Sequence, residues 1–201
     1  RWIAADIDGA DGTAVTSWRD IVNGRLLNVL TGSPTLRVAS GDKYVQLDGD
    51  DVLQQADTFA SALKTLIVLA RIPTATSPNG SLGIYGSSGY VWQYGSGSTL
   101  DVNAGSGGGG VTVQAGGLVR DAWSMLGAVQ NGASSIVAKD ATQVTGTLGT
   151  GALSQLVVGR RVSGGTIYRF DVAEIIGYTD ILTGSQLNAI RAALQANYAL
   201  Y

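Results

Sequence analysis

The chain has 201 residues, a net charge of −2 and charged side chains at 14% of its positions. This composition excludes a disordered tail, a coiled coil and a basic domain that grips phosphates, so we expect one domain over residues 1–201 that binds no nucleic acid. The chain contains no Cys and no His, which excludes disulfides, thiol nucleophiles, Cys/His zinc sites and a Ser-His-Asp triad.

Short apolar or alternating runs between turn residues make up most of the chain, and they predict an antiparallel sandwich or barrel. The strands that we expect cover residues 43–47, 65–72, 123–130, 134–139, 155–160 and 167–178. Within 65–72, the even-numbered residues are all apolar, and Ile67 and Leu69 are apolar on the other face. Such a strand belongs in the middle of a covered sheet. No apolar run approaches the roughly 18 residues of a membrane span, so we expect no membrane insertion.

Three segments carry turn or helix signals. Asn131-Gly132 separates two expected strands and favours a tight two-residue hairpin, because both residue types tolerate positive φ. Residues 57–63 are expected to form one or two helical turns, with Asp57 as the N-cap. Near the C-terminus, Thr183 and Gln186 have capping-box spacing and precede apolar residues at helical intervals. This pattern predicts a helix packed on the outside of the sandwich.

Six motifs follow one another along nearly the whole chain. They are Trp18-Arg19-Asp20 with Asn23-Gly24, Val45-Gln46-Leu47-Asp48-Gly49-Asp50-Asp51-Val52-Leu53, the apolar strand 66–72, Trp123 with Asn131-Gly132, Leu156-Val157-Val158-Gly159-Arg160, and Asp171-Val172-Ala173-Glu174-Ile175-Ile176-Gly177-Tyr178 before the terminal helix. Their order resembles that of concanavalin A-like, laminin-G-like jelly-roll domains of bacterial surface proteins and phage structural proteins. The chain departs from the family pattern at Phe170, where the family usually has Gly, and at Leu47, where it has Phe.

The resemblance implies an all-β fold, an antiparallel two-sheet jelly-roll sandwich with a C-terminal α-helix. It also implies a non-enzymatic recognition module, extracellular or part of a virion, that binds carbohydrate. The alternative is a purely structural domain of a virion or surface assembly that contacts neighbouring protein subunits. A homo-oligomer is compatible with both functions.

Asp48, Asp50 and Asp51 follow the expected strand 43–47 and are the candidate ligands of a structural calcium ion, because adjacent loop carboxylates supply hard oxygen atoms. We expect no other cofactor. The alternative is turn chemistry, in which Asp-Gly reverses the chain and the aspartates accept local backbone N–H groups. We favour turn chemistry, because calcium needs six or more oxygen ligands and only three carboxylates are adjacent.

Glu174, the single Glu of the chain, is the residue to weigh for glycoside hydrolysis. Strict alternation places it on the same strand face as Phe170 and Val172. A retaining glycosidase needs a second carboxylate about 5–5.5 Å away, whereas alternation places Asp171 on the opposite face. We therefore expect no enzyme activity and a structural Glu174 that is bonded to the backbone or to an arginine.

Tyr90, Trp92 and Tyr94 alternate along one expected strand and are the candidate carbohydrate-binding residues. Sugar rings stack on such aromatic platforms, and Tyr and Trp keep a polar edge for hydroxyl groups and water. The alternative is an aromatic row packed in the core or against a subunit, which is the commoner fate of such rows. The flanking Gly/Ser loops keep the binding hypothesis open.

A small basic group surrounds the last expected strands. It consists of Arg160, Arg161 and Arg169, with Gly164-Gly165 as the turn between the strands. Such arginines bind the carboxylates of acidic glycans. More often they pair with local aspartates at a sheet edge, where they discourage edge-to-edge pairing.

Overall fold

The computed structural model describes two layers of β-strands and one α-helix. The residues that it describes are 1–55, 57, 59, 63–73, 84–85, 91–94, 100–103, 110–113, 119–148, 155–159 and 169–198. For the four short strands between residues 84 and 113, the backbone alone is described. The helical turns expected over residues 57–63 fall mostly outside the described residues.

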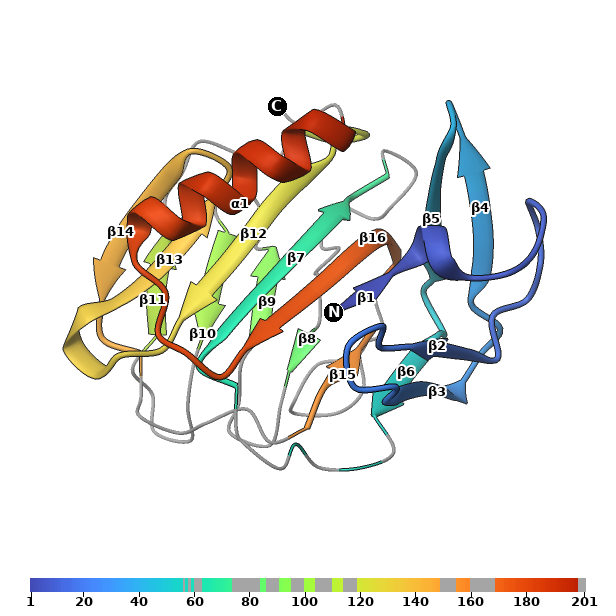
Figure 1. The fold of residues 1–201 in the computed structure, drawn as a ribbon, viewed down its shortest axis with the longest axis horizontal. Helices are drawn as coiled ribbons and strands as arrows, with labels where there is room; N and C mark the ends of the chain where they lie inside the picture. Colours follow the sequence, from blue (N-terminus) through green and yellow to red (C-terminus); the bar gives the residue numbers. More distant parts are fainter. Residues whose placement is uncertain are drawn as a thin grey trace.

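The larger layer is an antiparallel sheet of eight strands (Figure 1). Its members are β1 (Trp2–Ile3), β4 (Thr35–Ala39), β5 (Asp42–Asp48), β7 (Thr65–Arg71), β12 (Ser124–Val129), β13 (Ser135–Lys139), β14 (Thr142–Gly146) and β16 (Arg169–Tyr178). The strand order is β14-β13-β12-β7-β16-β5-β4, and β1 pairs with the second half of β16. Since β7 pairs with β12 on one side and β16 on the other, it lies in the middle of the sheet, as its two apolar faces predict.

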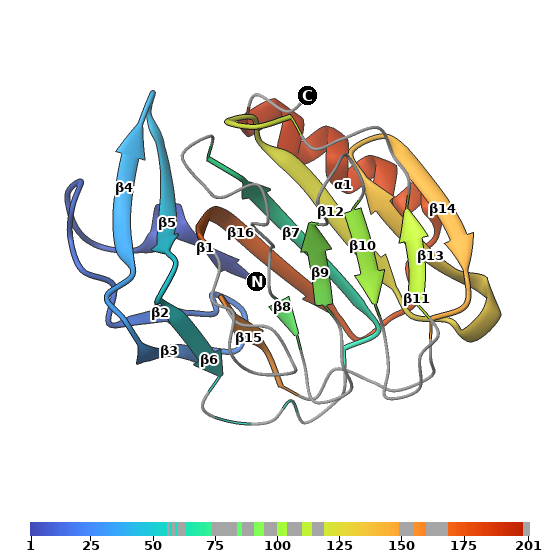
Figure 2. The same ribbon diagram turned by 180° about the vertical axis from the view of Figure 1, so that it is seen from behind.

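Two smaller sheets form the second layer. One has the strand order β2-β3-β6-β15-β8 and the other β11-β10-β9. Their bounds are Ser17–Arg19 (β2), Leu26–Thr31 (β3), Val52–Gln55 (β6), Ile84–Tyr85 (β8), Val91–Tyr94 (β9), Leu100–Asn103 (β10), Gly110–Val113 (β11) and Val157–Val158 (β15). Figure 2 shows β9, β10 and β11 in front of β7, β12 and β13 of the larger sheet. This arrangement confirms the predicted mostly-β sandwich with a C-terminal helix.

The core has two parts, one on each face of β7. Leu66, Val68 and Ala70 pack between the two layers with apolar residues of both. Ile67 and Leu69 pack on the outer face of the eight-stranded sheet, under the helix. The division of even and odd residues is the one that the sequence predicts.

The helix α1 (Gly184–Asn197) closes the outer part of the core and lies over β12 (Figure 1). Its predicted capping box is confirmed, because the Gln186 N–H donates to the Thr183 hydroxyl at 3.3 Å and the Thr183 N–H donates to the Gln186 side chain at 2.8 Å. Leu187 and Leu194 of α1 are buried against the sheet. No helix among the described residues has the length and apolar character that a membrane crossing requires.

The hairpin between β12 and β13 forms, but its predicted two-residue turn is wrong. Asn131 has φ −146°, outside the left-handed region that a type I′ turn needs at both positions. Gly132 has φ +56° and begins a short 3-10 helix over Gly132–Ser134. The Ser135 hydroxyl explains the longer connection, because it accepts from the Asn131 N–H and donates to the Gly132 carbonyl, both at 2.8 Å.

Gly159 and Gly41 offer a matched test of close packing between the end of β15 and the turn that joins β5 to β6. Both have positive φ, +99° and +89°, but an added Cβ at Gly159 would lie 2.2 Å from the Asp51 carbonyl oxygen, whereas one at Gly41 meets nothing within 4 Å. We expect Gly41→Ala to lose about 1–2 kcal/mol of unfolding free energy from backbone strain. Gly159→Ala should lose about 1–3 kcal/mol more from overpacking. Equilibrium urea denaturation measures both losses, and equal losses would contradict the packing argument.

Candidate functional site

Asp48, Asp50 and Asp51 meet at the turn between β5 and β6, and one carboxylate oxygen of each lies within 4.8 Å of the others. Asp48 and Asp50 are exposed, whereas Asp51 is only 1% exposed. Both oxygens of Asp51 accept backbone N–H groups, Oδ1 from Ser33 and Oδ2 from Asp48 at 2.8 Å. This geometry is the turn chemistry that the sequence favours, and calcium binding at the same three carboxylates stays a prediction.

The environment of this acidic turn favours the neutral form of two of its carboxyl groups. Burial raises the pKa of Asp51, although the two N–H groups that it accepts pull the pKa back. The pKa of Asp50 is raised because its carboxyl group shares a hydrogen bond with Asp48 and lies close to that charge. Binding of a proton or a cation would relieve this repulsion.

The candidate aromatic row falls where only part of the chain is described. Trp92 and Tyr94 belong to β9, opposite Val102 and Leu100 of β10, so the predicted strand exists. The structure describes the backbone of these residues, and Tyr90 lies outside the described residues. Carbohydrate binding by Tyr90, Trp92 and Tyr94 therefore stays a prediction.

The basic group is described in part. Arg169 begins β16 and lies opposite Asp48 in the strand register. Arg160 and Arg161 lie outside the described residues. Register alone does not establish a side-chain contact, so the expected pairing of Arg169 with a local aspartate stays a prediction; the expected sheet edge is wrong, because β16 is an inner strand.

A β-bulge in β16 overturns the predicted positions of its two carboxylates. Val172 lies opposite Ala70 and Glu174 opposite Leu69, so Ala173 is the extra residue. After this bulge the alternation is reversed, and Ile175 points into the core between the layers, in line with Val172 before the bulge. Glu174 therefore lies on the outer face. The predictions that Glu174 shares a face with Phe170 and Val172, and that Asp171 lies opposite to it, are wrong.

Arginines bind both carboxylates on this outer face. Asp171 is 0% exposed and accepts from Arg71 Nε at 2.9 Å and Nη2 at 2.6 Å. Glu174 is 2% exposed and accepts from the Arg1 side chain. Burial raises the pKa of Asp171, and the ion pair with Arg71 partly offsets the rise. The expected structural Glu174 bonded to an arginine is confirmed.

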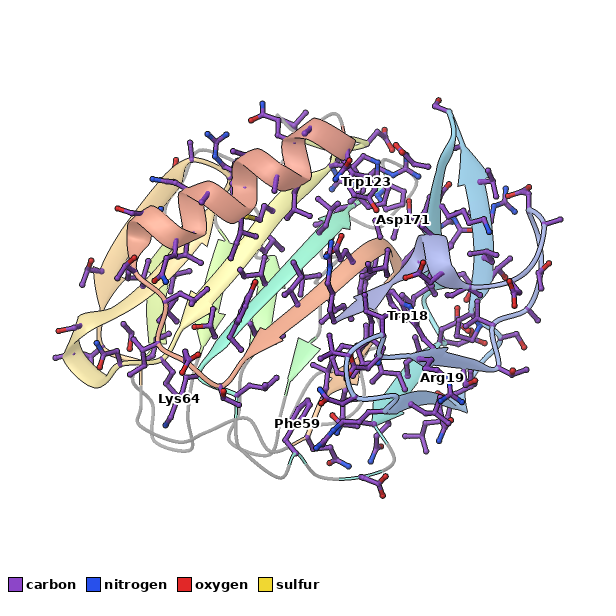
Figure 3. All side chains as sticks on the ribbon, in the orientation of Figure 1. Trp18, Arg19, Phe59, Lys64, Trp123 and Asp171 are labelled. Atoms are coloured by element: carbon purple, nitrogen blue, oxygen red, sulfur yellow. The ribbon has the colours of Figure 1, made fainter. Side chains whose placement is uncertain are left out.

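Arg71 lies at the centre of a cluster that the sequence analysis missed. Its guanidinium group is 4.7 Å from the ring centroid of Tyr44 and 5.0 Å from that of Trp123. The two rings meet edge to face at 5.6 Å, and Figure 3 shows Trp123 close to Asp171. The cluster fixes Arg71 against Asp171, so its rings serve packing. The sequence signal that could have revealed this cluster is the position of Arg71 at the end of an otherwise apolar strand.

A pocket of about 410 Å³ opens where β1, the turn after β2 and the end of β16 converge; we call it the N-terminal pocket. Its lining consists of Arg1, Trp2, Asp20, Asn23, Arg25, Phe59, Leu63, Gly177, Tyr178, Thr179 and Asp180. The Arg25 guanidinium lies 5.1 Å from the Phe59 ring, and Trp2 meets Phe59 edge to face at 6.3 Å. Sequence reasoning missed this pocket because its walls come from four separate segments.

Asp20 fixes one wall of the N-terminal pocket. Its Oδ1 accepts from the main-chain nitrogen of Arg1 at 2.7 Å and from the Val22 N–H at 2.9 Å. Its Oδ2 accepts from the Asn23 N–H and Nδ2, both at 3.2 Å. Burial alone would raise the pKa of Asp20, but these donors lower it below its ordinary value. Asp20 is therefore a fully occupied structural carboxylate.

No protein-family model and no curated protein matches the chain. Among solved structures, domain 4 of AbnA, a GH43 extracellular arabinanase from Geobacillus stearothermophilus in complex with arabinotriose, is 17% identical with a TM-score of 0.62, over 80% of this chain and 82% of that chain. Trypanosoma rangeli sialidase in complex with sialic acid is 16% identical with a TM-score of 0.65, over 96% of this chain and 32% of that chain. The receptor binding domain of the botulinum neurotoxin C/D mosaic serotype is 10% identical with a TM-score of 0.60, over 90% of this chain and 51% of that chain. At these identities the likeness shows the fold.

The turn role of Asp51 can be tested by substitution. In Asp51→Asn, the new amide nitrogen would face a backbone N–H donor, and we expect a loss of about 1–3 kcal/mol of unfolding free energy. Asp48→Asn is the control, because that exposed side chain accepts no backbone N–H from the described residues. Urea denaturation measures both losses.

Calcium should leave the melting temperature of the wild type unchanged, because turn chemistry already accounts for the three aspartates. A rise in melting temperature that Asp48→Asn and Asp50→Asn abolish would instead establish a metal site.

The raised pKa of Asp50 predicts a pH dependence. Since the folded state holds this proton more tightly than the unfolded chain, stability falls as the pH rises from the ordinary carboxyl range near 4 through the raised value. We expect the melting temperature of the wild type to fall relative to that of Asp50→Asn between about pH 4 and pH 7. Asp8→Asn, an exposed aspartate outside the turn, is the control. A constant difference between wild type and Asp50→Asn would refute the repulsion.

Proposed function

We propose that the chain is a concanavalin A-like, laminin-G-like jelly-roll module that recognises carbohydrate, as part of an extracellular or virion protein. The observation that carries this proposal is the sandwich that the chain shares with an arabinanase domain solved with arabinotriose, over most of the length of both. A structure of botulinum neurotoxin type C is a further neighbour of this chain, with a TM-score of 0.57 and 10% identity. Cell entry of that toxin depends on interaction with two ganglioside molecules. A fold does not fix a function, so a binding experiment has to decide.

The absence of catalysis is part of the proposal, and the two carboxylates of β16 support it. A glycosidase acid or nucleophile has to reach the bond that it cleaves. Asp171 and Glu174 are buried on the outer face and are each bound by an arginine. Hydrolysis of a polysaccharide that is lost in Glu174→Gln would contradict this part of the proposal.

A second function, contact with neighbouring subunits in a virion, surface assembly or homo-oligomer, is favoured by one observation. Ile21 and Val22 are adjacent in the turn after β2 and are 50% and 70% exposed. Exposed apolar neighbours are common at subunit contacts. A subunit interface above roughly 1,000 Å² together with no glycan binding would support this function over the first.

A glycan array tests the proposed function. We expect the wild type to bind a defined class of glycans, and Trp92→Ala to weaken binding at the β9 row about tenfold through loss of ring stacking. Leu30→Ala, which removes an exposed apolar side chain from β3, is the control. Binding that Trp92→Ala leaves intact would place the site elsewhere, and an array without specific hits would reject carbohydrate recognition.

A further inference from the structure

The N-terminal pocket has the size and shape of a small-molecule site. Its volume of about 410 Å³ falls in the range of roughly 300–1,000 Å³ that ligand pockets occupy. Phe59 and Tyr178 are partly exposed in its wall, whereas Trp2 is 1% exposed. Phe59 and Tyr178 therefore offer ring surface on which a ligand can stack, and the buried Trp2 closes the bottom of the pocket.

Several polar groups of this pocket have no hydrogen-bond partner in the described part of the chain. The Trp2 Nε1–H is buried and has no acceptor there. Asn23 uses its N–H and Nδ2 on Asp20, which leaves Oδ1 as a fixed acceptor. Thr179 and Asp180 are exposed, and their side chains bond to no described residue. The buried Trp2 N–H is closed to a ligand, so the open groups that a ligand in the pocket can reach are Asn23 Oδ1, Thr179 and Asp180.

The charges that line the pocket balance one another. Arg1 and Arg25 are matched by Asp20 and Asp180. Arg1 is engaged by Glu174, and Asp20 is saturated by its four donors. A carboxylate or phosphate ligand would find no uncompensated positive charge, whereas sugar hydroxyls, which both donate and accept, suit a mixture of open donors and acceptors.

We propose that the N-terminal pocket is a second binding site, separate from the β9 row, that takes one or two rings of a neutral sugar. In this site, Asn23, Thr179 and Asp180 bind sugar hydroxyls while a ring face contacts Phe59 or Tyr178. The choice of ligand class rests on the proposed function. The site itself rests on the pocket and on its open hydrogen-bonding groups.

Nuclear magnetic resonance on the ¹⁵N-labelled full chain tests this site with arabinotriose, lactose and 3′-sialyllactose as probes. We expect saturable shifts of the backbone amides of Asn23 and Thr179. Among the four Trp indole signals, the sequentially assigned Trp2 signal should move most, because Trp2 lines the pocket and the ligand changes its surroundings. At least one neutral probe should produce these shifts, and sialyllactose should add no affinity over lactose.

Two pairs of variants locate the effect. Thr179→Trp fills the pocket and should abolish the shifts, whereas Thr145→Trp, at an exposed position of β14, should keep them. Asp180→Ala should weaken binding about three- to tenfold, whereas Asp8→Ala, an exposed aspartate of a separate pocket, should not. Trp92→Ala should leave the pocket shifts unchanged.

The outcomes separate this inference from the proposed function. Shifts at Trp2, Asn23 and Thr179 that Thr179→Trp removes and Trp92→Ala retains support the second site. Glycan binding on the array without shifts at these residues overturns the second site and leaves the proposed function standing. Tighter binding of sialyllactose than of lactose overturns the assignment to neutral sugars. No binding of any probe or array glycan overturns both.

Discussion

Burial of β7 on both of its faces is the constraint on which the rest of the structure depends. A strand that is apolar on two sides needs a cover on each, and the chain supplies a second layer of strands for Leu66, Val68 and Ala70 and the helix α1 for Ile67 and Leu69. The neighbouring strand β12 is buried along its whole length for the same reason. Polar side chains in this central part of the sheet must therefore be paired, because water cannot reach them.

The bulge in β16 meets this requirement for Glu174. Without the bulge, strict alternation over the same residues would direct the Glu174 carboxylate into the core between the layers, on the face of Val172. With the bulge, Ile175 fills that core and Glu174 reaches the outer face, where Arg1 binds it. An unpaired buried charge is among the costliest defects in a protein interior, which gives a physical reason for a bulge in a strand that otherwise pairs regularly with β7.

Features set by local pattern could be predicted from the sequence, and features set by distant partners could not. The two faces of β7 and the capping box at Thr183 depend on residues a few positions apart. The bulge serves an ion pair between residues 1 and 174, and the β12–β13 turn depends on the hydroxyl of Ser135. The acidic turn was found, because its three aspartates are adjacent in sequence. The N-terminal pocket was not found, since no periodicity connects Asn23, Phe59 and Asp180.

Pairing of the buried charges of β16 supports the proposal of a recognition module without catalysis. The two buried carboxylates of β16, Asp171 and Glu174, are each held by an arginine, so neither is free to approach a substrate. Open hydrogen-bonding groups gather instead where β1 and β16 end, around a pocket whose floor belongs to the core. Leu63 packs so closely on Gly177 that an added Cβ there would lie 2.5 Å from its side chain, and Asp20 locks the opposite wall. Fixed walls reduce the ordering cost of binding, which supports the proposed ligand site in this pocket.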